Sequence, residues 1–344
     1  MSASIAIGAR KVGLGSPCFV IAEAGVNHNG DLGLAHELVE IAAGCGADAV
    51  KFQTFDPSGL VSQDAAPAPY QAARGAASQT EMLEALTLPE KGWIELAAHA
   101  REVGITFLST AFDRRSLELL LAVGVEVLKS PSGELDNIEY LSHLASAGLP
   151  VIVSTGLGTM DEVAAAVEAT GLAPGIALLH CVTAYPAPLP ASNLRAMSTM
   201  AEAFDVPVGW SDHTVGPVTS VVAVGLGASI LEKHITADRA HLGPDHAASE
   251  DPPSFAEYVR SVREAEAALG DGVKRPAEVE LQNLVFARRS YHARRDLQAG
   301  ESLSERDVVL LRPATGIPPS VAVVGRAVAR AVPAGRALVP EDLA

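Results

Sequence analysis

The sequence is poor in aromatic residues and in long apolar runs. Aromatic side chains make up 4% of the 344 residues, so Ala, Val, Leu and Ile must fill the core that a chain of this length can bury. No apolar run is long enough to span a bilayer, and we expect no membrane partner. Segment 1–13 also lacks the long apolar stretch of a signal peptide.

Cysteine is scarce, and positive charge is outnumbered by negative charge. The three cysteines, Cys18, Cys45 and Cys181, are too few and too scattered for a disulfide framework or a zinc site. Each lies in an apolar segment, which is typical of a reduced, cytoplasmic protein. The formal net charge of −16 would repel a phosphate-rich polymer, so nucleic acid is not an expected partner. A small anionic substrate needs only a local group of lysines or arginines.

Short apolar runs alternate with helical segments over residues 1–269. Runs that are apolar throughout are typical of a parallel sheet whose two faces are covered by helices. Such runs, repeated over about 250 residues, predict an α/β fold, a closed (β/α)8 TIM barrel. A doubly wound open sheet is the alternative, but the first turn, AGVNHNGD, is not a Gly-x-Gly-x-x-Gly loop. The predicted strands are 18–25, 48–54, 105–110, 125–132, 150–156, 176–182, 206–213 and 228–235.

The barrel pattern ends at residue 269, and two further segments interrupt or follow it. Residues 270–284 form a polar linker, and residues 285–344 show short strand-like runs with Pro and Gly turns. They predict a separate, small β-rich domain that gains stability by docking on another surface. The connection 55–86 is unusually long for a compact domain, which is typical of a lid or binding loop.

The polar residues of the sequence gather where the predicted strands end. In a (β/α)8 barrel the active site lies at the carboxyl ends of the strands. Polar groups are costly in an apolar barrel unless they are paired or used, so we expect one site at this mouth. The residues at the strand ends are Glu23, Lys51, Gln53, Ser109, Thr110, Lys129, Ser132, Ser154, Thr155, His180, His213 and His234.

Two of these residues, His213 in SDHT and His234 in EKHIT, end the last two predicted strands. Because these strands are neighbours, both imidazoles can reach one divalent metal ion, with water, substrate oxygen or a carboxylate such as Glu23 in the other positions. Such an open site of mixed ligands suits Mn²⁺, Co²⁺, Fe²⁺ or Mg²⁺. The alternative is that each histidine only forms a hydrogen bond with the carboxylate beside it, Asp212 or Glu232.

Two lysines, Lys51 and Lys129, are predicted at the same mouth. With the neighbouring hydroxyls they suit an anion that carries a phosphate and a carboxylate, because ammonium groups supply charge and hydroxyls fix orientation. Lys51 also has the alternative of a salt bridge to Glu23, and the two roles are compatible in the empty enzyme. A Schiff-base lysine is a third possibility, against which the paired histidines argue.

These residues stand in motifs that resemble the sialic acid synthases, the family of N-acetylneuraminate synthase and its nonulosonate relatives. The resemblance covers almost the whole chain, and the combination of motifs is highly specific. The tail LRPATGIPP (311–319) looks like the C-terminal antifreeze-like, or SAF, domain of that family. The other motifs are IAEAGVNHNGD (21–31), DAVKFQTF (48–55), FLSTAFD (107–113), LKSPSGELDN (128–137), VSTGLG (153–158), LLHCVTAYPAP (178–188), VGWSDHTVG (208–216), EKHIT with GPDHAAS (232–249) and ARRS (287–290).

The resemblance implies a TIM barrel with an SAF domain, in a domain-swapped homodimer. It also implies that phosphoenolpyruvate condenses with an N-acyl aldose, usually N-acetylmannosamine or its 6-phosphate, to a nine-carbon 2-keto acid and phosphate. The implied catalytic residues are Glu23, which helps to activate water, Lys51 and Lys129. The two lysines would hold phosphoenolpyruvate together with Thr110, Ser132 and Ser154.

The remaining implied roles concern the metal and the sugar. His213 and His234 would bind a divalent metal ion, Mn²⁺ in the first place and otherwise Co²⁺ or Mg²⁺. The sugar would be contacted by Gln53, Tyr185 and Asp245, and Arg312 of the partner subunit would bind its N-acyl group.

Two positions on the sugar side depart from the family's pattern. Ala184 stands where some members have Asn, and His241 stands where Met is common. Because both positions would face the sugar, they leave its identity open within the family. The resemblance makes N-acetylneuraminate the first expectation for the product, and legionaminic and pseudaminic acids are the alternatives.

Two rival functions make different demands on the sequence. A 3-deoxy-keto acid synthase that acts on an aldose phosphate shares the barrel and phosphoenolpyruvate but does not need the SAF tail. A carbohydrate- or ice-binding protein would not need lysines, a glutamate and histidines at one barrel mouth. Ice binding also requires a flat, uncharged face, whereas ARRSYHARRD (287–296) is basic.

Overall fold

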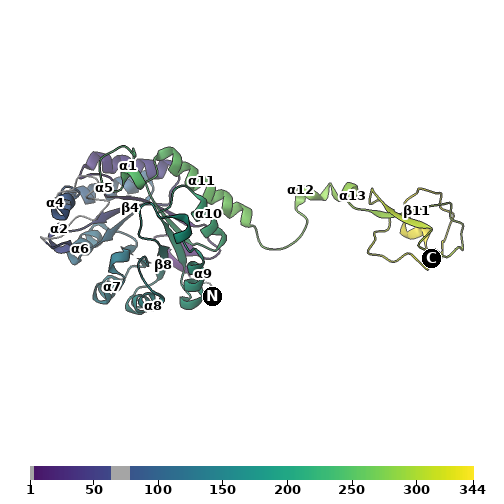
Figure 1. Ribbon diagram of the computed structural model, residues 1–344, viewed down its shortest axis with the longest axis horizontal. Helices are drawn as coiled ribbons and strands as arrows, with labels where there is room; N and C mark the ends of the chain where they lie inside the picture. Colours follow the sequence, from purple (N-terminus) through teal and green to yellow (C-terminus); the bar gives the residue numbers. More distant parts are fainter. Residues whose placement is uncertain (1–3, 63–77) are drawn as a thin grey trace. The chain divides into compact units, whose positions relative to one another are not determined.

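A computed structural model describes residues 4–62 and 78–344, and the chain forms two compact units, Met1–Gly270 and Asp271–Ala344. In the first unit parallel strands close into a barrel in the order β10-β3-β4-β5-β6-β7-β8-β9. This closed barrel, with helices around the strands (Figure 1), confirms the predicted TIM-barrel fold. The strands are β3 (Phe19–Gly25), β4 (Ala49–Thr54), β5 (Thr106–Ala111), β6 (Leu128–Ser130), β7 (Val151–Ser154), β8 (Ile176–Cys181), β9 (Val208–Asp212) and β10 (Ile230–His234).

The helices that cover the barrel begin and end at residues suited to those positions. Asp31 caps the first helix, since its carboxylate accepts hydrogen bonds from the N–H groups of Gly33 and Leu34. Gly104 ends another helix in the left-handed conformation, which glycine adopts at little cost. The helices are α1 (Leu32–Gly44), α5 (Glu90–Val103), α6 (Arg114–Val123), α7 (Ile138–Ala145), α8 (Met160–Ala169), α9 (Arg195–Phe204), α10 (Val218–Gly225) and α11 (Pro252–Leu269).

The pleat of the strands divides the apolar side chains of the barrel between two cores. Outward residues such as Phe52 and Trp210 pack with the helices in a large core. Inward residues such as Ile152 fill the barrel and form a second, smaller core. Two short N-terminal strands, β1 (Ser4–Ile7) and β2 (Arg10–Gly13), contribute to this inner core.

The hairpin of β1 and β2 closes the barrel at the amino ends of its strands. Ile5, Ile7 and Val12 are buried in one cluster with Phe19 and Ala49, which lie at the starts of β3 and β4. Sequence analysis did not predict this hairpin, because strands of four residues carry too little alternation to be recognised. The amino ends of the strands are thus covered by apolar side chains, which leaves the polar residues at the carboxyl ends.

The long connection between β4 and α5 contains two short helices, α2 (Pro57–Leu60) and α4 (Gln79–Glu84). Its central part, 63–77, lies outside the described residues, so the hypothesis of a lid or binding loop stays a prediction. Within the described ranges no helix is long and apolar enough to cross a membrane.

The second unit is a small β domain with its own core. Strands β11 (Ser290–Ala293) and β12 (Val308–Leu311) pair in antiparallel fashion, and isolated bridges such as Leu297 with Val332 extend the pairing. Its buried cluster includes Leu303 and Val328. Two short helices, α12 (Glu278–Leu281) and α13 (Leu284–Ala287), lie in or beside the predicted linker.

Candidate active site

The carboxyl ends of the barrel strands surround a polar cavity of about 230 Å³. Side chains alternate along each strand, so residues two apart reach the same side of the sheet. The residues of the first unit to which the family resemblance assigns a role all line this cavity. These residues are Glu23, Lys51, Gln53, Thr110, Lys129, Ser132, Ser154, Tyr185, His213, His234 and Asp245.

Lys51 forms a buried ion pair with Glu23 at the floor of the cavity. Its Nζ lies 2.7 Å from Glu23 Oε2 and 3.7 Å from Glu232 Oε2, and it donates a hydrogen bond of 3.1 Å to Thr110. Gln53 Nε2 donates to the other oxygen of Glu23 over 3.0 Å. The salt bridge that the sequence left as an alternative for Lys51 is therefore present.

Glu23 has the properties of a proton acceptor that works near neutral pH. Its carboxyl group is fully buried, and this burial raises its pKa to about 7. The negative charge of Glu232 adds to the rise, whereas the ammonium of Lys51 opposes it. A base is most effective when its pKa lies close to the working pH.

Lys129 is also buried, but its neighbours differ from those of Lys51. Its Nζ donates hydrogen bonds to Ser154 Oγ at 2.5 Å and to the carbonyl oxygen of Ser130 at 2.9 Å. No carboxylate of the described residues forms an ion pair with it. Burial lowers the pKa of this lysine, because a charge without a counter-ion is costly away from water. The structure thus holds an amine that an anionic ligand would stabilise in its charged form.

The hydroxyl of Ser132 lies next to a position where only glycine fits. Ser132 Oγ accepts a hydrogen bond of 3.0 Å from the N–H of Gly156. A Cβ atom on Gly156 would come within 2.7 Å of this hydroxyl and of Thr183 Oγ1. Glycine therefore leaves room for the Ser132 hydroxyl at the wall of the cavity, close to the end of β7.

The two histidines meet on neighbouring strands, as the sequence predicts. β9 and β10 pair in parallel, and the ring centroids of His213 and His234 are 5.5 Å apart. The ring of Tyr185 lies 4.1 Å from that of His213. Neither Asp212 nor Glu232 forms a hydrogen bond with these rings among the contacts of the described residues, which argues against the alternative of a simple His–carboxylate pair.

Each imidazole has a nitrogen available for a ligand. His213 Nδ1 lies 2.7 Å from the carbonyl oxygen of Val182, and since a carbonyl only accepts, this nitrogen carries the hydrogen and Nε2 keeps its lone pair when the ring is neutral. His234 Nδ1 is buried without a hydrogen-bond partner among the described residues. Burial and nearby positive charges hold the pKa of His234 well below its usual range, so this ring is neutral.

Three residues predicted at the strand ends point away from the cavity. Ser109 forms a hydrogen bond with Thr54 on the outer face, and Thr155 Oγ1 donates to the carbonyl of Leu179. His180 packs on Trp210, with ring centroids 5.1 Å apart. The expectation that they share the site is wrong, because each lies next to an inward residue and the strand alternation turns it outward.

Sequence analysis missed other residues that line the cavity, among them Glu232, Ser211 and Cys181. The signal for two of them was present. Glu232 lies two positions before His234 on β10, and Ser211 lies on β9 two positions before His213, which directly follows that strand. Ser211 Oγ donates a hydrogen bond of 3.1 Å to Glu232 Oε1.

Asp245 reaches the cavity from the loop that follows β10. This loop is held against the loop after β3, because Asn29 Nδ2 donates to the carbonyl of Leu242 over 2.9 Å. The buried ring of His246, next to Asp245 in the chain, lies 3.2 Å from the side-chain oxygen of Asn29. Arg312 belongs to the second unit, where it is exposed directly after β12.

Comparisons with known proteins assign both units. Residues 38–274 match the model of the NeuB family, and residues 288–344 match the SAF domain. The chain belongs to the NeuB family. It is 46% identical to the N,N'-diacetyllegionaminic acid synthase of Legionella pneumophila over 98% of this chain and 97% of that protein.

Two further relatives of this NeuB-family protein define the breadth of the match. The N-acetylneuraminate-9-phosphate synthase of Mus musculus is 36% identical over 86% of this chain and 83% of that protein. The crystal structure of N-acetylneuraminic acid synthetase from Leptospira borgpetersenii, in complex with citrate, superposes with a TM-score of 0.74 at 34% identity, over 82% of this chain and 95% of that one.

These matches confirm the resemblance on which the sequence analysis relied. The protein is a phosphoenolpyruvate-dependent condensing synthase of the NeuB family, with an SAF domain at its C-terminus. The SAF match also removes the main support for a 3-deoxy-keto acid synthase that acts on an aldose phosphate, because that rival does not need the tail.

Proposed function

We propose that this protein condenses phosphoenolpyruvate with a six-carbon aldose that carries two N-acetyl groups, to give N,N'-diacetyllegionaminic acid and phosphate. The observation that carries the proposal is the convergence of two buried lysines, a carboxyl group with a pKa near 7 and two histidines on one barrel mouth. N-acetylmannosamine, the sugar first expected from the sequence, is the second candidate.

The choice of sugar rests on similarity. Identity is 46% to a legionaminic acid synthase and 36% to an N-acetylneuraminate-9-phosphate synthase, with both matches covering most of the chain. A nine-carbon acid built from the three carbons of phosphoenolpyruvate requires a six-carbon partner. The two N-acetyl groups in the name of the product must then come from that partner.

The lysines and hydroxyls hold phosphoenolpyruvate in this proposal. Lys129 and Ser154 bind its phosphate, because Lys129 is a buried amine that forms no ion pair with a carboxylate in the described parts of the chain. Lys51, Thr110 and Ser132 complete the binding of the anion and fix its orientation. Such positioning accelerates a condensation because the two reacting carbons are held close together.

Glu23 acts on the water that completes the reaction. The C3 carbon of phosphoenolpyruvate forms a bond to the aldehyde carbon of the open-chain sugar. The aldehyde oxygen takes up a proton from solvent and becomes a hydroxyl group, and positive charge is left at C2. Water adds to C2, Glu23 takes its proton, and loss of phosphate yields the 2-keto acid. The pKa of about 7 suits this transfer.

His213 and His234 hold a divalent metal ion, Mn²⁺ in the first place, in the same proposal. The neutral ring of His234 fits this role, and so does Nε2 of His213, which keeps its lone pair when the ring is neutral and Nδ1 donates to Val182. No group of three or more His, Cys, Asp or Glu side chains suited to a metal occurs in the described parts of the chain, so water or substrate would supply the remaining ligands. When bound, such an ion supplies Lewis-acid polarisation of a carbonyl group.

The experiment is a measurement of phosphate release from phosphoenolpyruvate with a panel of aldoses. The panel contains the diacetamido hexose, N-acetylmannosamine and N-acetylmannosamine 6-phosphate, with Lys129→Met as the inactive control. We expect the highest kcat/KM with the diacetamido sugar. A higher kcat/KM with either N-acetylmannosamine compound would refute the choice of sugar, and no release with any sugar would refute the reaction.

A further inference from the structure

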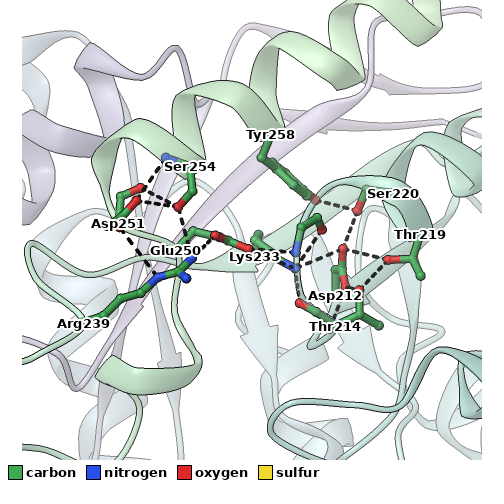
Figure 2. A network of polar contacts seen from close by, with 11 residues as sticks. Asp212, Thr214, Thr219, Ser220, Lys233, Arg239, Glu250, Asp251, Ser254 and Tyr258 are labelled. Atoms are coloured by element: carbon green, nitrogen blue, oxygen red, sulfur yellow. Dashed lines mark hydrogen bonds and ion pairs between the residues drawn. The ribbon is translucent and has the colours of Figure 1, made fainter.

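Figure 2 shows a second polar cluster, centred on Asp212 and Lys233. Neither of these residues lines the active-site cavity, whereas His213 and His234 do. Asp212 directly precedes His213, and Lys233 directly precedes His234. The alternation of side chains therefore places each of these charged residues back to back with a histidine of the site. Asp212 and Lys233 are also Cα partners in the register of β9 with β10, so one pair of outward residues lies behind one pair of inward histidines.

Asp212 ties together the chain on both sides of His213. One of its oxygens, Oδ1, accepts hydrogen bonds from the N–H of Thr214 at 2.8 Å and from the hydroxyl of Thr214 at 2.7 Å. The other oxygen accepts from Thr219 at 3.0 Å and from Ser220 at 2.8 Å. This carboxylate therefore closes a turn around His213 and links that turn to helix α10.

Lys233 ties the same turn to the strand that carries His234. Its Nζ donates to the carbonyl oxygen of Thr214 and, over 3.3 Å, to that of Gly216. It lies 3.3 Å from Asp212 Oδ2 and 5.6 Å from the ring centre of Tyr258. One amine thus fixes the distance between the strand of His234 and the turn that holds His213.

Glu250 closes the cluster on the side of His234. Its N–H donates to the carbonyl oxygen of His234 over 2.8 Å, and its Oε1 accepts from the N–H of Gly216 at 3.1 Å. Lys233 Nζ lies 3.8 Å from the same carboxylate, whose other oxygen is bound by Arg239.

Stability alone does not account for such a cluster. The side chains of Lys233 and Asp212 are 2% and 0% exposed, and removing two charges from water costs about as much as their attraction returns. Apolar residues of similar size often serve stability equally well. The ion pair instead restricts conformation, because its hydrogen bonds fix the backbone next to the two histidines.

We propose that Asp212 and Lys233 are positioning residues, which hold His213 and His234 in the mutual orientation that binding of one metal ion by both rings requires. The inference rests on the proposed metal role of these histidines. With two ligands, affinity depends strongly on how well the rings are preorganised, and residues behind metal ligands typically contribute 10- to 100-fold to affinity.

The test compares Lys233→Met with wild-type protein in two titrations. Calorimetry on metal-free protein measures the Kd of Mn²⁺, and a second titration without metal measures the Kd of phosphoenolpyruvate. We expect Mn²⁺ to bind about 10- to 100-fold more weakly and phosphoenolpyruvate to be unaffected within about twofold. The sign is informative, because loss of a positive charge would by itself tighten the binding of a cation.

Two further variants separate positioning from a general loss of stability. Ser220→Ala removes one of the four hydrogen bonds to Asp212, together with the 2.7 Å hydrogen bond between Ser220 and the Tyr258 hydroxyl. Because it keeps both charges, it should fold and weaken the binding of Mn²⁺ severalfold. Arg263→Met is the matched control, since it breaks the 2.7 Å ion pair with Asp48 at the opposite end of the barrel. This control should lower the Tm and leave both dissociation constants unchanged.

The outcomes distinguish the inference from the proposed function. If wild-type protein binds no Mn²⁺, the metal role of the histidines and this inference are both wrong. If wild-type protein binds Mn²⁺ and the Lys233→Met and Ser220→Ala variants bind it as tightly as the Arg263→Met control, only the positioning role is wrong. An equal loss of Mn²⁺ and phosphoenolpyruvate binding would also overturn it, because the cluster would then act on the whole barrel. If Lys233→Met fails to fold, Ser220→Ala decides.

Discussion

Replacing Lys129 by methionine should affect substrate binding and folding stability in different ways. Methionine fills a similar volume without the charge, so the change removes the amine and leaves no large cavity. In the folded protein this amine contacts only neutral oxygens, those of Ser154 and Ser130, among the described residues. Its buried charge therefore lowers the free energy of unfolding until an anion binds beside it.

The magnitude follows from these contacts. Removing one partner of a buried ion pair with phosphoenolpyruvate costs about 2–4 kcal/mol, which is roughly 30- to 1000-fold in affinity. Stability without substrate should change little, because loss of two hydrogen bonds to a charged donor, about 1.5–3 kcal/mol each, is offset by relief of the desolvation of a buried ammonium.

Lys51→Met is the matched comparison. It removes an ammonium that is 2.7 Å from Glu23 and 3.7 Å from Glu232, and leaves two buried carboxyl groups facing one another. Breaking such a pair costs about 3–5 kcal/mol, so its Tm should fall clearly. Lys91→Met, on the exposed face of α5, should change neither quantity.

Two measurements check this prediction: calorimetric titration with phosphoenolpyruvate and thermal unfolding of the free protein. If Lys129→Met binds phosphoenolpyruvate as tightly as the wild-type protein does, Lys129 is not an anion ligand. If its Tm falls as far as that of Lys51→Met, its role is structural and the reasoning from unpaired charge is wrong.

Three further predictions concern pH, metal and the second unit. The pKa of Glu23 is raised from 4.5 to about 7, so between these pH values the folded state binds a proton that the unfolded state does not. The free energy of unfolding should therefore fall as pH rises from about 4.5 to 7, which denaturant titrations of the wild-type protein can measure. In Glu23→Gln the part of this pH dependence that comes from Glu23 should be absent. EDTA should abolish phosphate release, and Mn²⁺ should restore it; full activity after EDTA treatment would contradict the metal role of the histidines. The His234→Ala variant should lose both turnover and its dependence on metal. A homodimer with Arg312 of the partner subunit at each site predicts that inactive Arg312→Ala and Lys129→Ala chains regain partial activity when refolded together; no recovery would count against shared sites.

Much of the barrel and its mouth follows from local sequence alone. Runs apolar on both faces predict buried parallel strands, and the polar residue at the end of each run, such as Glu23 or His234, marks the mouth. The alternation of side chains then predicts which neighbours share the site. The alternation places Glu232 at the cavity and His180 outside it. A list of strand ends alone omits Glu232 and wrongly includes His180.

The tertiary structure decides what pairs with what. Lys51 and Lys129 are equivalent in the sequence, as single lysines at strand ends. In the structure Lys51 lies 2.7 Å from a carboxylate oxygen, whereas Lys129 forms no ion pair within the described ranges. This difference arises because Glu23 lies on β3 beside β4, whereas Lys129 on β6 neighbours Ser154. The pKa of a side chain depends on such distances in three dimensions, so the sequence alone does not predict it.

The same holds for the cluster behind the histidines and for the hairpin that closes the barrel. Motifs place Asp212 beside His213 and Lys233 beside His234, but only the register of β9 with β10 brings the two outward charges into contact. Ile5 and Ile7 have no local signal, and their role is set by the apolar barrel interior that they cover. Local sequence determined the strands and the residue types at their ends, because backbone geometry acts over a few residues. Pairing, burial and charge were decided by tertiary structure, because they depend on strands that are far apart along the chain.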